Sequence, residues 1–111
     1  MIHPGAATSF TGVQRDGRES YVATIRSYVA MVRRLFPDRS SAVARLAVRD
    51  DEFRSMCADY GMAVETLDLL ERRNHPMDVE RMIEYRALIK ELERDLKGEL
   101  LASAGNATDW G

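Results

Sequence analysis

Apolar residues recur every three to four positions along most of this chain, which is the spacing of an amphipathic α-helix. Four such segments follow one another, at about 19–36, 40–48, 51–73 and 77–101. The flanking stretches 1–16 and 104–111 are rich in small and polar residues and show no period. The pattern therefore predicts a single all-helical domain over residues 17–103, with a flexible tail at each end.

The two long segments are joined by the short stretch "RRNHPMD" at 72–78. A connection this short requires the two helices to fold back on each other. Asn74 can end the first helix, and Pro76 suits the first turn of the second. Between Phe53 and Leu67 the apolar steps alternate between four and three residues, as in coiled coils. We expect an all-α fold: a long antiparallel, coiled-coil-like helical hairpin, with an additional N-terminal amphipathic helix and a short connecting helix.

The predicted N-terminal helix carries little charge, since Arg26 is the only charged residue between Tyr21 and Val32. Such a helix is usually covered on more than one side. An interfacial membrane helix is the alternative, but that class needs a strongly charged face. Met62 and Leu69 form a second apolar patch on the helix at 51–73. These surfaces predict self-association, and the candidate interaction residues are Met62, Leu69, Tyr21, Ile25, Tyr28, Val32 and Trp110.

The residue types that carry chemistry are sparse. His75 precedes a proline, which disfavours helix at that position, so we expect a turn or N-cap role. Cys57 falls on the apolar face, and no basic residue lies one helical turn away to stabilise a thiolate. The sequence offers no nucleophile–base pair, glycine-rich phosphate loop or three-ligand metal set. It predicts neither an enzyme nor a metal or cofactor site.

The 111 residues carry a net charge of -2, but the charge is unevenly distributed. Residues 1–49 hold eight arginines and three acids, a balance of +5, while residues 50–111 hold eight basic and fifteen acidic residues, a balance of -7. A single cysteine, no signal-peptide pattern and no long apolar run together predict a cytoplasmic protein without a membrane span.

From Leu35 onward, "LFPD", "RDDEFRSMCADY", "LDLLER" and "VERMIEYRALIKELERDL" follow in an order that resembles the YdcH-like family of small bacterial proteins. The likeness covers about residues 35–100 and rests on Phe36-Pro37, on Phe53 after its acidic helix start, and on the stretch from Leu67-Asp68 to Glu71. The added first helix and the "NHPMD" connection depart from the family's pattern. The resemblance implies a cytoplasmic helical hairpin and brings no catalytic residues.

The leading hypothesis is a non-enzymatic interaction or assembly protein that forms a homo-oligomer and binds an unidentified protein partner. The alternative is a nucleic-acid-associated protein that uses Arg33, Arg34, Arg39, Arg45 and Arg49. The acidic pI of 5.7, the absence of a recognition-helix motif and the few exposed aromatic residues argue against it. A third hypothesis, action at membranes through the first helix, has the least support.

Overall fold

The computed structural model describes the backbone of residues 22–110 and the side chains of residues 22–104. Within these residues the regular elements are helices. In chain order they are a first helix described over 22–35, η1 (Pro37–Arg39), α2 (Ser40–Arg49), α3 (Asp51–Arg73), η2 (Pro76–Asp78) and α4 (Val79–Trp110). The predicted all-α class is confirmed. The predicted tail at 1–16 lies outside the described residues.

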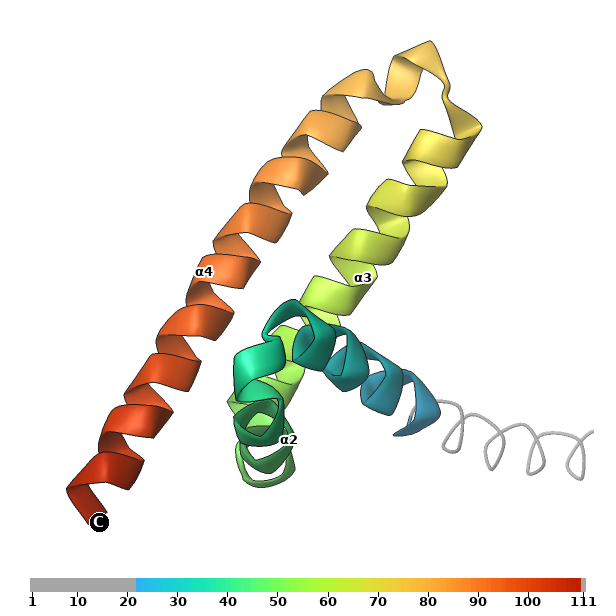
Figure 1. Cartoon of the computed structure of the whole chain (residues 1–111). Helices are drawn as coiled ribbons and strands as arrows, with labels where there is room; N and C mark the ends of the chain where they lie inside the picture. Colours follow the sequence, from blue (N-terminus) through green and yellow to red (C-terminus); the bar gives the residue numbers. More distant parts are fainter. Residues whose placement is uncertain (1–21, 111) are drawn as a thin grey trace, which may run out of the picture.

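The helices α3 and α4 lie side by side as a long antiparallel hairpin (Figure 1). The short η2 turn joins them at one end, which we call the turn end. At the other end, the open end, α2 packs against both long helices, and the first helix crosses α3 (Figure 1). This arrangement confirms the hairpin with its N-terminal and connecting helices.

The ends of α3 are fixed by local hydrogen bonds, which explains why its bounds follow from the sequence. At the start, the Asp50 carboxylate accepts a 3.1 Å hydrogen bond from the backbone N–H of Phe53. Asp51 and Glu52 then place negative charge in the first turn, where the helix dipole favours it. At the other end, Asn74 adopts a left-handed conformation with φ 49°, and its N–H donates to the Leu70 carbonyl.

His75 has the turn role that the sequence predicts. It is the N-cap of η2, and its Nδ1 accepts a 3.2 Å hydrogen bond from the backbone N–H of Met77. Pro76 occupies the first position of this turn. The turn is further stabilised by Arg73, whose guanidinium donates a 2.9 Å hydrogen bond to the Asp78 carboxylate. Asp78 is only 5% exposed, so this ion pair satisfies a buried charge.

The last helix is longer than the sequence predicts. Its expected range was about 77–101, with a flexible tail from residue 104, but α4 continues to Trp110. Ala102 and Ala104 are strong helix formers and no proline follows them, so the helix can continue past Leu101. The composition of small residues, which indicated a tail, is equally compatible with continued helix.

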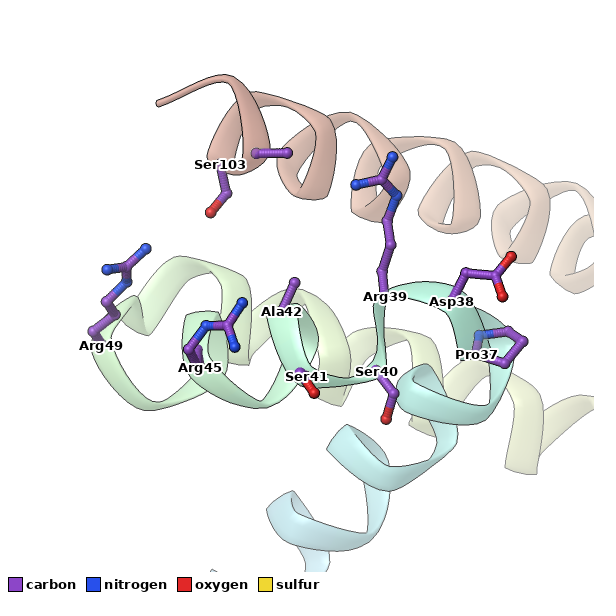
Figure 2. Close-up of a pocket in the computed structure, with 10 residues that line it drawn as sticks. Pro37, Asp38, Arg39, Ser40, Ser41, Ala42, Arg45, Arg49 and Ser103 are labelled. Carbon is purple, nitrogen blue, oxygen red and sulfur yellow. The ribbon is translucent and has the colours of Figure 1, made fainter. Parts of the chain in front are cut away.

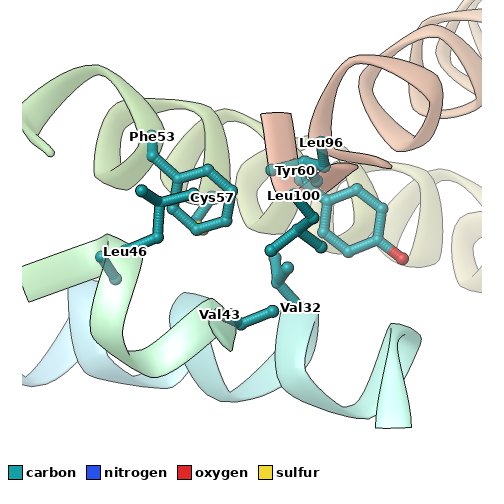
Figure 3. Close-up of a cluster of buried hydrophobic side chains, with 9 residues drawn as sticks. Val32, Val43, Leu46, Phe53, Cys57, Tyr60, Leu96 and Leu100 are labelled. Carbon is teal, nitrogen blue, oxygen red and sulfur yellow. The ribbon is translucent and has the colours of Figure 1, made fainter. Parts of the chain in front are cut away.

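The hydrophobic core lies at the open end, where all four helices contribute side chains (Figure 3). Its most completely buried members are Val32 from the first helix, Val43 from α2, Phe53 and Cys57 from α3, and Leu96 and Leu100 from α4. Towards the turn end, Ala63, Leu70 and Met82 are buried between α3 and α4. The core therefore depends on elements that are far apart in sequence, and it positions every surface considered below.

Gly61 is the point at which the first helix meets α3. Glycine inside a helix costs about 1 kcal/mol relative to alanine, which predicts a close neighbour at this position. That neighbour is the Tyr28 ring, which occupies the space that a β-carbon on residue 61 would need. The close approach thus comes from an aromatic side chain, and it seats the first helix on the hairpin.

Candidate interaction surfaces

The candidate interaction residues divide into a buried and an exposed group. Tyr28 and Val32 are buried within the chain, where they pack the first helix onto its own hairpin. Ile25 is half-buried. Met62 and Leu69 are 49% and 61% exposed, as a surface contact requires. Tyr21 and the Trp110 side chain lie outside the described residues.

Tyr28 is held by a polar contact as well as by its packing on Gly61. Its hydroxyl donates a 2.6 Å hydrogen bond to a carboxylate oxygen of Glu65, one turn further along α3. This hydrogen bond raises the pKa of the Tyr28 phenol, with burial and the Glu65 charge acting in the same direction. The first helix is therefore held on α3 by a partly buried hydrogen bond to Glu65 and, beside it, by the packing of the Tyr28 ring on Gly61.

The exposed back of α3 carries a short apolar strip, which we call the α3 strip and define as Met62, Thr66 and Leu69. These positions are spaced four and three residues apart, so they share one face of the helix. The Thr66 hydroxyl donates to the Met62 carbonyl at 2.8 Å, which satisfies its polar group within the helix. An ion pair between Arg72 and Asp68, 3.0 Å long, lies at the edge of the strip.

Further exposed apolar side chains gather at the turn end of the hairpin. They are Met77, Val79, Ile83 and Leu88, and they leave large apolar area in contact with water. A scattered exposed aliphatic residue needs no explanation, but several on one half of a small domain indicate a contact surface. The turn end thus has fewer buried and more exposed apolar residues than the open end.

A cleft lined by arginines opens between α2 and the far part of α4, with a volume of about 490 Å³ (Figure 2). Arg39, Arg45 and Arg49 line it from the η1 and α2 side, and Ser103 lines it from α4. In Figure 2 Arg39 reaches across the gap towards α4. We call this hollow the arginine cleft. Among the described residues, no carboxylate forms an ion pair with any of its three arginines.

A second hollow of about 420 Å³ adjoins the arginine cleft, and the two share Pro37 and Ser40 as lining residues. Arg33 and Arg34 line this second hollow. The Arg33 guanidinium donates a 2.8 Å hydrogen bond to the Ser40 hydroxyl, which fixes the boundary between the two hollows. The fold therefore brings together all five arginines that the sequence nominates.

An apolar groove of about 630 Å³ runs along the outer side of the first helix and α2. Ile25 and Val29 line it from the first helix, and Ala47 and Val48 line it from α2. Val48 is 81% exposed. The groove explains why Ile25 remains only half-buried although Tyr28, one turn further along the same helix, is covered.

Cys57 is packed in the core as the sequence predicts. It is fully buried, and burial raises the pKa of its thiol to about 12, so the nucleophilic thiolate is disfavoured. Within the described residues, no group of three histidine, cysteine or acidic side chains has the arrangement of a metal site.

Within the described residues, no helix is both long enough and apolar enough to cross a membrane. No protein-family model, curated protein or solved structure matches the chain. The YdcH-like resemblance therefore stays a prediction from the sequence motifs.

The sequence indicates the arginines of the cleft but not the α4 residue that lies opposite them. Ser103 lies just beyond the predicted helix at 77–101, more than fifty positions from α2 along the chain. Only the hairpin fold brings it opposite Arg39 and Arg49. No local signal marks such a residue, because a cleft between two helices is defined by their packing.

Proposed function

We propose that this protein is a non-enzymatic helical interaction module that self-associates through the α3 strip. The observation that carries the proposal is the exposure of Met62 and Leu69 on a helix whose opposite face is fully used in the hairpin. Apolar side chains at this spacing gain stability when a second helix covers them.

A second copy of the chain is the simplest occupant of the strip. In a two-fold arrangement the same patch meets itself, so each copy covers the other's Met62 and Leu69. If the two α3 helices run antiparallel about Thr66, equal spacing places Asp59 of one copy opposite Arg73 of the other. Both side chains are exposed on this helix, and Arg73, which donates to Asp78 through one nitrogen, has further N–H groups to offer. Opposite charges at the two ends of the strip favour this orientation.

The lack of nucleophile–base geometry around Cys57 and His75 accords with an interaction role. His75 uses its Nδ1 in a backbone cap, and the Cys57 thiol is buried. An assembly protein needs neither group to react. Its specificity resides in apolar side chains and in the charges beside them.

The test is the absolute mass of the purified protein by light scattering behind a sizing column. We expect a mass at least twice the 12.6 kDa of one chain for the wild type, and a lower mass for Leu69→Asp. The matched control is Val48→Asp, which makes the same change at another exposed apolar position, on α2. A wild-type monomer at high protein concentration, or equal loss of mass in both variants, would contradict the proposal.

A further inference from the structure

We propose that the arginine cleft and the hollow beside it bind the phosphodiester backbone of a nucleic acid. This inference does not depend on self-association, because none of the residues concerned belongs to the α3 strip. It rests on five arginines from three consecutive elements, the first helix, η1 and α2, which line two adjoining hollows. A chain of regularly spaced phosphates is the ligand whose charge pattern matches two neighbouring cationic hollows.

The charge of these hollows is not neutralised within the described part of the chain. Over residues 22–49 there are six arginines and one acid, Asp38, which leaves a balance of +5. The ion pairs of the described residues all involve α3, η2 and α4. The acidic majority of the protein therefore sits on the hairpin, while this face keeps its positive charge for an external anion.

Guanidinium groups suit phosphate because their planar donor forks match its oxygens in pairs. The hydroxyls of Ser40, Ser41 and Ser103 line the same cleft, and hydroxyls also donate to phosphate oxygens. Ser40 already accepts from Arg33, so its own hydroxyl hydrogen can be directed to a ligand.

The lining also indicates how the nucleic acid is read. Among the residues whose side chains the structure describes, those that line the two hollows include no aromatic ring on which a base can stack. Contacts to phosphate alone position a strand without reading its sequence. We therefore infer binding that depends strongly on salt and weakly on sequence.

A membrane surface is the competing polyanion, and the shape of the site disfavours it. Peripheral membrane helices place apolar side chains beside their basic residues, so that these enter the lipid. The arginine cleft lies instead between two helices, and besides its three arginines and the single carboxylate of Asp38 it is lined by serine, alanine and proline. A linear strand can enter such a cleft, whereas a flat surface of headgroups contacts its rim.

The experiment measures fluorescence anisotropy of labelled single-stranded RNA and duplex DNA of random sequence, titrated with the intact protein from about 50 mM to about 200 mM salt. The test variant is Arg45→Gln with Arg49→Gln. The matched control is Arg81→Gln with Lys90→Gln, two exposed positions of α4 outside the cleft that carry the same loss of charge. Circular dichroism establishes that both variants remain helical.

We expect the wild type to bind at low salt and the test variant to bind at least about tenfold more weakly, with a salt slope smaller by about two. The control keeps its affinity within about twofold. Failure of the wild type to bind either nucleic acid at low salt would overturn the inference. So would an equal loss in both variants, or binding to anionic phospholipid vesicles without binding to nucleic acid.

Discussion

The two ends of the α3–α4 hairpin are built differently. At the open end, α2 and the first helix add Val32, Val43 and their neighbours to the seam, and the core residues there are almost inaccessible to solvent (Figure 3). At the turn end, two helices face each other alone, and Met77 is 82% exposed. A two-helix layer has too little apolar surface to cover all its own side chains. The chain therefore completes its core at one end only.

This contrast also separates the two surfaces proposed for binding. The α3 strip begins beside Gly61, where the first helix packs, and extends from there towards the turn end. The arginine cleft depends on α2 being seated against α4, and so belongs to the well-packed half. Damage to the open-end core is expected to impair the cleft as well, while changes in the strip leave it intact.

The largest predicted effect comes from truncating the open-end core. Leu96→Ala removes a fully buried side chain and leaves a cavity, so we expect a loss of about 3 kcal/mol in unfolding free energy. Leu69→Ala makes the same change at an exposed position of α3. It should change the unfolding free energy by less than about 0.5 kcal/mol at a protein concentration low enough to keep the chain monomeric. Urea unfolding followed by circular dichroism measures both. Similar losses would remove the distinction between the two ends.

The contact that seats the first helix is tested by Gly61→Ala. An added β-carbon overlaps the Tyr28 ring, so we expect destabilisation of about 2 kcal/mol although alanine favours helix. Placing the same substitution in a Tyr28→Ala background removes the clash, and there Gly61→Ala should be neutral or stabilising. If the penalty is the same in both backgrounds, Tyr28 is not its cause.

Cys57 makes the stability of the open end sensitive to alkaline pH. Its pKa is raised to about 12 in the folded chain, so the contribution of the neutral thiol is complete below the ordinary value of 9.0 and is lost as pH rises from there towards 12. Between about pH 8.5 and about pH 10, wild type should lose about 1 kcal/mol of unfolding free energy under reducing conditions. Cys57→Ala should show a flatter dependence over this range.

Above about pH 10 the ionisation of tyrosines also changes the unfolding free energy, and this higher range serves as the control for the pH series. The hydrogen bond to Glu65 raises the pKa of Tyr28, and burial raises that of Tyr60, so their contributions are also lost as pH rises. Both proteins should therefore lose stability in that higher range. A wild type as insensitive as Cys57→Ala below it would show that the buried thiol is not responsible.

The smallest predicted effect concerns the ion pair that joins the two long helices near the turn end. Arg86 donates to Glu71 across the hairpin at 3.0 Å, with both side chains about half exposed. Because water screens such a pair, Glu71→Gln should cost about 0.5 kcal/mol, and added salt should reduce the difference. A loss comparable to that of Leu96→Ala would mean that polar contacts, not the apolar seam, hold the turn end.

The elements that follow from local chemistry were predictable from the sequence. The bounds of α3 are set by Asp50 at its start and by Asn74 and Pro76 after its end, and each of these is visible as a residue type in its place. The burial of Cys57 follows from its position on the apolar face. By contrast, the end of α4 was placed too early, since alanine-rich helix and flexible tail share a composition.

Contacts between distant segments were not predictable. The sequence indicated that the first helix is covered, but not that Tyr28 would fill the space beside Gly61. The sequence indicated five candidate arginines, but not that the packing of η1, α2 and α4 places three of them around one cleft. Periodicity gives the buried face of a helix, whereas the partner of that face depends on the packing of the whole chain.

Amide hydrogen exchange at low and high protein concentration tests whether a second copy completes the turn half of the hairpin. In dilute solution, backbone amides of α3 over 66–73, beyond the Tyr28 contact, should exchange faster than those over 53–60, because fewer elements cover them. On raising the concentration, exchange over 62–69 should slow while that over 53–60 stays unchanged. Equal protection of both halves, unaffected by concentration, would contradict the account.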